Sequence, residues 1–250
     1  MAAAAVRTME AALILALLQA RMSSTRLPGK VLKPLAGAPL ILRQIERVRR
    51  SRRIDRLVVA TSDQPSDDTL ASALQDAGVE VFRGPLDDVL ARFLGALDAF
   101  PAEQVVRLTA DCPLIDPQLI DAVIELHLRT GADYSPNRLA AAGFPKGQDV
   151  EVITAAALRR AGAEAATPEE HEHVTWGVWN HPDRYRISRL EPPVDEGDIR
   201  WTVDRPDDLE FVQAVYAALY PAKPAFSSDD IRAFVRANPQ WANWGGDRRV

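Results

Sequence analysis

The residues best suited to chemistry lie in one short loop near the start of the sequence. Residues 19–30 read QARMSSTRLPGK and place three cations, Arg21, Arg26 and Lys30, among hydroxyl residues, a proline and a glycine. Cationic side chains and the backbone N–H groups of a loop can converge on one anion. We therefore interpret this loop as a binding site for a nucleoside triphosphate. The simpler alternative is a basic surface loop before a helix.

The position of the loop favours the first interpretation. It directly follows residues 11–18, AALILALL, a short apolar run that is typical of a strand buried on both faces of a parallel sheet. Ligands of open α/β sheets bind outside the carboxyl ends of such strands. The loop has neither the glycine spacing of a Walker loop nor that of a dinucleotide-binding fingerprint. Side-chain cations would therefore do most of the phosphate binding.

Two aspartates follow later segments that we predict to be strands of the same sheet. Asp111 comes after the strand at 104–109, and Asp204 comes after the strand-like segment 199–203. Two carboxylates beside a polyphosphate repel it unless a divalent cation lies between them, and Mg²⁺ is usually held by one or two carboxylates, water and phosphate oxygens. We predict a shared Mg²⁺ site. For Asp204, capping of the helix that starts near Asp207 is an equal alternative.

The elements that position these residues alternate along the chain. We predict strands at 57–61, 79–82 and 104–109 and helices at 39–48, 66–77, 86–100 and 117–130. Asp116 fits an N-cap before Pro117 in the last of these helices. Strands that alternate with helices in this way indicate an α/β fold with a mainly parallel sheet flanked by helices.

The pattern changes after Gly131. Short strand-like pieces, such as 150–153 and 185–190, surround two helical segments rich in alanine and glutamate. We interpret residues 138–198 as an insertion that carries an acceptor pocket, a dimer contact or both. The sequence then returns to the core at 199–204 and ends with helices at 207–219 and 228–237.

Composition limits the remaining possibilities. The 250 residues are 47% hydrophobic, which is enough for one domain over residues 11–250, and we expect residues 1–10 to form a disordered tail. The net charge of −5 gives no basic field for nucleic acid. A single cysteine, Cys112, excludes a disulfide framework and fits a cytoplasmic protein, and we expect it to be a small buried residue. The apolar N-terminus imitates a secretory signal, but cleavage there would remove the first strand, and no segment is long enough to span a membrane.

Several separate motifs, in one order, resemble the cytidylyltransferases that activate acidic sugars. Within that family the sequence is most similar to the branch of spore coat polysaccharide biosynthesis proteins. The match runs from about residue 12 to about residue 215. Besides the loop at 19–30, the motifs are Ala60-Thr61-Ser62-Asp63, Val81-Phe82-Arg83-Gly84, residues 107–117 (RLTADCPLIDP) and Trp201-Thr202-Val203-Asp204.

The resemblance implies a nucleotide-diphosphosugar-transferase-like fold and a homodimer. It also implies a reaction in surface polysaccharide biosynthesis, in which CTP, Mg²⁺ and a small anionic acceptor give a CMP-linked product and pyrophosphate. The residues that it assigns to nucleotide binding are Ala20, Arg21, Ser23, Ser24, Arg26, Lys30, Arg83 and Asp111. Of these, Arg21, Lys30 and Asp111 would be catalytic, Arg83 would border the base, and Asp111 and Asp204 would bind the metal. The acceptor-side residues would be Gln148, Asp149, Glu151 and His173.

One position departs from the family pattern. The family loop commonly reads Arg-x-Gly-Ser, whereas this chain has Ser23 in place of the glycine. Glycine permits a positive φ and close approach of a phosphate, and serine restricts both. His171 and His173 form a His-x-His pair without a third spaced ligand, which is a weak zinc signal.

Two other functions stay open from the sequence. A glycosyltransferase that uses a finished nucleotide sugar also needs an acidic metal site, and a non-catalytic nucleotide-binding partner of polysaccharide assembly would keep the same loop. The three cations favour a triphosphate, because a pyrophosphate leaving group carries more charge than a nucleotide sugar. The resemblance, and not the spacing of residues, favours CTP over UTP and a sugar acid over other anionic acceptors.

Overall fold

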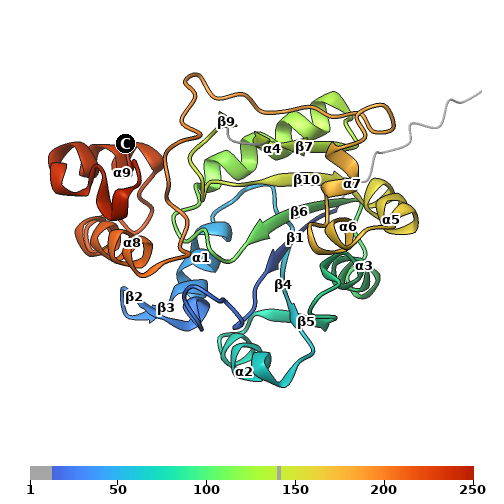
Figure 1. Ribbon diagram of the computed structural model, residues 1–250, viewed down its shortest axis with the longest axis horizontal. Helices are drawn as coiled ribbons and strands as arrows, with labels where there is room; N and C mark the ends of the chain where they lie inside the picture. Colours follow the sequence, from blue (N-terminus) through green and yellow to red (C-terminus); the bar gives the residue numbers. More distant parts are fainter. Residues whose placement is uncertain (1–12, 140–141) are drawn as a thin grey trace, which may run out of the picture.

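The computed structural model describes residues 13–139 and 142–250, and the predicted tail at 1–10 lies outside them (Figure 1). A six-stranded sheet forms the centre, in the order β5-β4-β1-β6-β10-β7. Strands β1, β4, β5 and β6 are parallel, whereas β10 is antiparallel to both of its neighbours. The strands are β1 (Ile14–Gln19), β4 (Arg56–Ser62), β5 (Glu80–Gly84), β6 (Gln104–Thr109), β7 (Tyr134–Pro136) and β10 (Glu151–Thr154).

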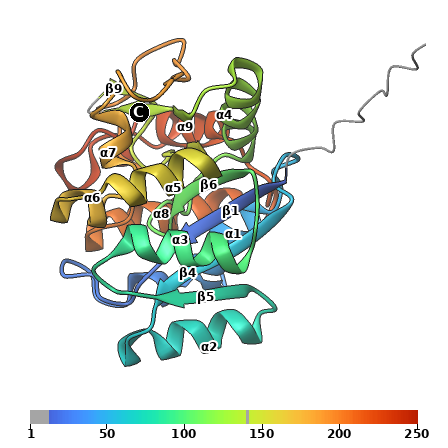
Figure 2. The same ribbon diagram turned by 90° about the vertical axis from the view of Figure 1, so that its right-hand side faces the viewer.

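Alternate residues of β1 supply two separate cores, one on each face of the sheet. Ile14, Ala16 and Leu18 pack with α1 (Leu40–Val48), α2 (Asp68–Asp76) and α4 (Pro117–Thr130). Leu15 and Leu17 pack with α3 (Val89–Ala99) and α5 (Ala155–Glu164) on the other face, which Figure 2 shows with α3 in front of the strands. Each buried leucine or isoleucine side chain contributes about 1.5–3 kcal/mol on burial. The continuous apolar run of β1 therefore reflects burial on both faces.

The strand order reverses beside β1. The chain runs outward from β1 through β4 to β5, and α3 then leads back to β6 on the other side of β1. At such a switch point the loops that follow neighbouring strands leave in different directions and open a crevice at the carboxyl ends. The loop after β1 and the residues after β6 both lie at this crevice.

Capping residues determine where the helices begin and end. The Asp116 side chain accepts a hydrogen bond from Gln118 N, Pro117 occupies the first turn, and Gly131 ends α4 with φ 60°. These features confirm the predicted helix over 117–130 and the capping role of Asp116. The short helix α6 (Pro168–Glu172) starts with a capping box between Thr167 and Glu170, and α7 (Trp176–Trp179) follows it.

The C-terminal part adds a third hydrophobic core beside the sheet (Figure 1). Helices α8 (Pro206–Leu219) and α9 (Ser228–Ala237) enclose a core that includes the fully buried Trp201. Within residues 13–139 and 142–250, no helix has both the length and the apolarity needed to cross a bilayer. The short elements are η1 (Lys30–Leu32), β2 (Pro34–Leu35), β3 (Ala38–Pro39), η2 (Pro65–Asp67), β8 (Arg138–Leu139), β9 (Ala142–Gly143), η3 (Pro239–Trp241) and η4 (Trp244–Gly246).

Two strand predictions were wrong. Residues 199–204 form no strand and have one isolated bridge, between Lys146 and Arg200. Residues 185–190 likewise have one bridge, between Tyr134 and Ile187. The alternating apolar residues of the first segment belong to the third core. Trp201 and Val203 bury their side chains there instead of extending the central sheet.

Candidate functional site

A cleft of about 540 Å³ lies at the switch point. It extends from the loop after β1 across the end of β6 to the start of α3 and the end of α6. Its lining residues are Gln19, Ala20, Arg21, Ser23, Ser24, Thr25, Arg26, Lys30, Val31, Asp87, Val89, Arg92, Arg107, Thr109, Ala110, Asp111, Glu172, His173 and Asp204.

The cationic loop is fixed at both ends by backbone contacts. Met22 N donates to Asp67 Oδ1 at 2.6 Å, and Gly29 N donates to Met22 O at 3.0 Å. Gly29 has φ 66°, a conformation that glycine adopts at little cost, and it closes the loop just before Lys30. Arg21 and Arg26 remain exposed, and Arg26 also contacts Asp204.

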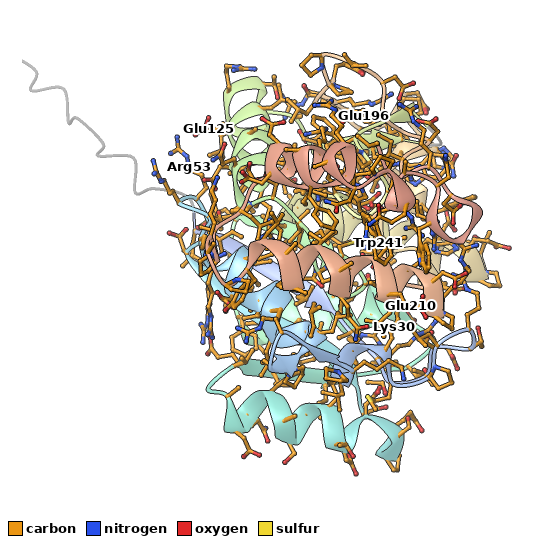
Figure 3. The ribbon with its side chains drawn as sticks, turned by 90° about the vertical axis from the view of Figure 1, so that its left-hand side faces the viewer. Lys30, Arg53, Glu125, Glu196, Glu210 and Trp241 are labelled. Carbon is orange, nitrogen blue, oxygen red and sulfur yellow. The ribbon has the colours of Figure 1, made fainter. Side chains whose placement is uncertain are left out.

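Lys30 lies between the two aspartates. Its Nζ donates to Val203 O at 2.7 Å and to Asp204 Oδ1 at 2.9 Å, and it lies 3.4 Å from Asp111 Oδ2. Figure 3 labels Lys30 among the side chains near α8, which begins two residues after Asp204. The Lys30 side chain is only 12% exposed. Asp111 and Asp204 therefore do meet in space, but in this state an ammonium group joins them.

Asp204 is positioned by the backbone around Asp111. Val203 N and the Thr202 hydroxyl both donate to Asp111 O, at 2.8 and 3.1 Å. Gly147, with φ 103°, allows this approach, because a Cβ there would lie 2.5 Å from Thr202 N. The site thus needs no strand at 199–204: two loops meet at the end of β6.

Cations surround the carboxylate of Asp204. Arg200 lies 2.9 Å and Arg26 3.2 Å from Asp204 Oδ2. Burial alone would raise the pKa of Asp204, but the hydrogen bond and charge of Lys30, together with Arg200 and Arg26, lower it. Asp204 is therefore a buried carboxylate that stays ionised.

The capping alternative for Asp204 was wrong. It is the Asp208 carboxylate that accepts from Asp204 N and Arg205 N, each at 3.0 Å, at the start of α8. Asp208 also pairs with Arg200 and with the fully buried Arg249. Burial opposes ionisation of Asp208, but these hydrogen bonds lower its pKa well below the usual range.

Of the predicted acceptor-side residues, only His173 lines the cleft. Gln148 is buried: its Nε2 donates to Leu114 O, and its Oε1 accepts from Asp116 N. Glu151 accepts from Arg107, Tyr134 and Thr175 and thereby holds Arg107 in place.

Asp149 does not line the cleft. Its carboxylate accepts from Gly147 N at 2.7 Å. Burial raises its pKa, and the negative charges of Asp111 and Glu151 add to the effect.

Arg83 lies elsewhere than predicted. Its guanidinium donates to Ser62 O at 2.9 Å and Gln64 O at 3.0 Å and pairs with Asp68 at 2.6 Å, so it does not line the cleft. Cys112 is buried, as predicted, and burial raises the pKa of its thiol well above the usual value.

Two charged cleft residues, Asp87 and Arg92, had no signal in the sequence, and two others, Arg107 and Glu172, were not assigned a role. Arg107 lies inside β6, where its side chain points away from the apolar core toward Gln19 and Glu151. Besides opening the motif at 107–117, Arg107 is a charged residue within an otherwise apolar strand. Arg92 lies in a helix that reads as amphipathic, where an arginine is ordinarily exposed.

Ser23 requires no strained backbone. Among the described residues, the non-glycine positions with positive φ are Ala36 and Val174. The loop therefore takes its shape with ordinary φ at position 23, and the missing glycine does not distort it.

The residues present fit Mg²⁺ only together with a phosphate ligand. No group of three or more His, Cys, Asp or Glu side chains suited to a metal occurs among the described residues. Asp111 and Asp204 supply two carboxylates, which matches the usual Mg²⁺ site completed by water and substrate phosphate oxygens. His171 bonds to Asp88 at 2.9 Å instead of joining a zinc site with His173.

Known proteins are similar to this chain in sequence and fold. A cytidylyltransferase family model matches residues 15–185. The chain is 37% identical over 236 residues to the spore coat polysaccharide biosynthesis protein SpsF of Bacillus subtilis, covering 92% of this chain and 96% of that protein. It is 34% identical over 243 residues to the 3-deoxy-manno-octulosonate cytidylyltransferase of Anaeromyxobacter sp. strain K, covering 81% and 97%.

A solved structure agrees with these relatives. A cytidylyltransferase from Leptospira borgpetersenii superposes with a TM-score of 0.85 at 29% identity and covers 91% of this chain and 95% of that one. The fold is thus the nucleotide-diphosphosugar-transferase type. With the family model, these relatives and the loop–carboxylate cluster in agreement, the chain belongs to the cytidylyltransferase family and is a nucleotidyltransferase.

Proposed function

We propose that this protein transfers CMP from CTP to a small acidic sugar or a related anionic acceptor, with Mg²⁺, in surface polysaccharide biosynthesis. The observation that carries the proposal is the cluster of Lys30, Asp111 and Asp204 directly beside the cationic loop. Two relatives, a spore coat polysaccharide biosynthesis protein and a 3-deoxy-manno-octulosonate cytidylyltransferase, support the same chemistry.

The residues would divide the work by charge. Arg21 and Arg26 would neutralise charge that grows on the leaving pyrophosphate, an electrostatic effect worth about 3 kcal/mol per contact. Asp111 and Asp204 would hold Mg²⁺, which would draw electron density from phosphate oxygens when bound. An acceptor oxygen would attack the α-phosphorus, and no covalent enzyme intermediate is required.

Lys30 would change partners in this scheme. In the free protein its ammonium group contacts Val203 O and both carboxylates, which uses all three of its donors. Lys30 would release the carboxylates as the metal-bound nucleotide arrives and would then bind phosphate. The positive charge that the aspartates lose would be replaced by that of the metal.

Release of pyrophosphate tests the function. Each of the four nucleoside triphosphates is incubated with Mg²⁺ and a panel of sugar acids, sugar phosphates and polyol phosphates. We expect pyrophosphate with CTP and one acidic acceptor, and none without the metal. A glycosyltransferase would instead consume a nucleotide sugar, and a non-catalytic partner would bind CTP without turnover.

A further inference from the structure

Arg92 is a buried cation that no carboxylate neutralises. It is 2% exposed, lies in the first turns of α3, and lines the cleft. Its Nη1 donates to Pro85 O at 2.7 Å and to Leu86 O at 3.3 Å, while its buried Nε has no hydrogen-bond partner. No ion pair within 4.0 Å involves Arg92 in the part of the chain that the structure describes.

Three features make a positive charge unfavourable at this place. Burial lowers the pKa of Arg92, and the charge of Arg21 lowers it further. The N-terminal end of a helix also carries a partial positive charge, which disfavours a cation there. The charges of Asp67, Asp63 and Asp88 act in the opposite direction but do not outweigh burial and Arg21, so the pKa of Arg92 stays lowered. A negative group in the cleft would stabilise the charged form.

The carboxylates whose charges act on Arg92 are Asp67, Asp63 and Asp88, and each forms hydrogen bonds with other groups. Asp88 caps α3 by accepting from Ala91 N at 2.8 Å, and its other oxygen bonds His171 Nδ1 at 2.9 Å. Asp67 accepts from Met22 N and from the Ser62 hydroxyl. Asp87 and Glu172 line the same cleft but form no ion pair with Arg92. The protein therefore leaves this charge to be neutralised by a ligand.

A second buried arginine shows what a structural arginine looks like in this chain. Arg47, 1% exposed, also has no ion pair among the described residues and has a buried Nη1 without a hydrogen-bond partner, but it does not line the cleft. It donates to Ile115 O at 2.7 Å and Phe226 O at 3.0 Å, and its guanidinium lies 4.2 Å from the Phe226 ring centroid. It thus joins three segments that are distant in sequence. Arg92 donates only to carbonyls six and seven residues before it, so it links no distant parts of the fold.

We propose that Arg92 binds the acid group of the acceptor and thereby makes the enzyme specific for acids. This inference rests on the proposed function. The triphosphate has Lys30 and Arg26 at the Asp204 end of the cleft, whereas Arg92 lies at the α3 end, where His173 also lines the wall. A neutral group, such as the edge of a base, would leave the charge of Arg92 uncompensated.

The test uses sulfate as the probe anion, because the acceptor is unidentified. Calorimetry titrates sulfate into the whole protein saturated with CTP and Mg²⁺, so that the phosphate contacts are already occupied. We expect wild type to bind sulfate and Arg92→Gln to bind it at least about tenfold more weakly, since a charge-assisted contact is lost. We also expect the melting temperature of Arg92→Gln without ligand to be unchanged or higher, because an unfavourable buried charge has been removed.

Arg47→Gln is the matched control. It should lower the melting temperature and leave sulfate binding unchanged. Equal sulfate affinity of wild type and Arg92→Gln would overturn the proposal, as would absence of sulfate binding by wild type. Sulfate binding that disappears once CTP is present would assign the anion site to the nucleotide and would also overturn it. If CTP itself gives no heat, the proposed function fails, and the titration without CTP still decides whether Arg92 binds anions.

Discussion

The two ends of the cleft differ in whether carboxylates pair with their buried cations. At one end, Lys30 is matched by Asp111 and Asp204, and Arg26 also contacts Asp204. At the other end, Arg92 is equally enclosed but has no carboxylate partner. The first end is neutralised before any ligand arrives, so binding there must exchange partners. The second end holds an unpaired charge, so binding there needs only an anion.

The largest effect is expected from removing a carboxylate at the neutralised end. Asp111→Asn keeps the size of the side chain but removes the charge that would hold Mg²⁺ beside the phosphates. We expect CTP-dependent pyrophosphate release to fall by about a hundredfold to a thousandfold, or about 3–4 kcal/mol of transition-state stabilisation. Steady-state release of pyrophosphate measures it.

The control for that variant is Asp98→Asn, an exposed aspartate paired with Arg159 on the surface. It should retain wild-type turnover, and both variants should melt near wild type. Retention of most activity by Asp111→Asn would remove this residue from the metal site.

Lys30→Met separates the two roles proposed for the lysine, as counter-ion of the two carboxylates and as a phosphate ligand. Turnover should fall about a hundredfold, as for loss of one preorganised charge contact. In the absence of nucleotide, however, the two carboxylates lose their internal counter-ion and should attract a free cation. We expect Mn²⁺, followed by electron paramagnetic resonance, to bind Lys30→Met at least about tenfold more tightly than wild type.

Lys33→Met, three residues away and outside the cleft lining, is the matched variant for this measurement. It should bind Mn²⁺ as wild type does. Equal Mn²⁺ affinity of Lys30→Met and wild type would mean that the lysine does not occupy the place of the metal.

The neutralised end was largely predictable from sequence, and the unpaired end was not. Asp111 and the loop after β1 follow parallel strands with clear apolar patterns, so the sheet itself brings them together. Asp204 reaches the same place although residues 199–204 form no strand, because Thr202 and Val203 donate to Asp111 O. That contact depends on Gly147, far away in the sequence, and no local pattern encodes it.

Arg92 escaped prediction for a related reason. Helical periodicity tells which residues face the core, but it does not tell that a cleft opens beside one turn of that helix. Arg83 lies in a recognisable motif on the preceding strand and was therefore the arginine predicted to bind the nucleotide. Its guanidinium instead pairs with Asp68 and donates to two backbone carbonyls. Whether an arginine is satisfied by its neighbours is a property of tertiary structure alone.

His127 is a buried titratable group that is neutral at pH 7. It is 1% exposed, and its ring nitrogens lie 2.9 Å from Ser135 Oγ and Gln104 Oε1. Burial lowers its pKa from 6.5 to about 4. As pH falls below 6.5 the unfolded state takes up the proton first, so the folded state loses stability until about pH 4, by about 3 kcal/mol in total.

Urea unfolding of wild type and His127→Gln at a series of pH values measures this contribution. The glutamine variant should be less stable at pH 7.5 but should lose less stability than wild type on acidification to about pH 5.5, above the range in which most carboxylates titrate. Parallel pH dependence of the two proteins would show that His127 does not carry the effect.

The smallest effect is expected at Ser23, in the loop that forms the neutralised end. The family pattern that this loop resembles has glycine at that position, but Ser23 is not among the residues with positive φ, so glycine would relieve no strain. We expect Ser23→Gly to change kcat/KM by less than about threefold, or about 0.7 kcal/mol, and to lower stability by about 0.4–1 kcal/mol through greater freedom of the unfolded chain. Pyrophosphate release and urea unfolding measure the two. A gain in kcat/KM above tenfold would mean that the serine side chain keeps the phosphates from the loop, and the phosphate end of the cleft would then be less preorganised than its contacts indicate.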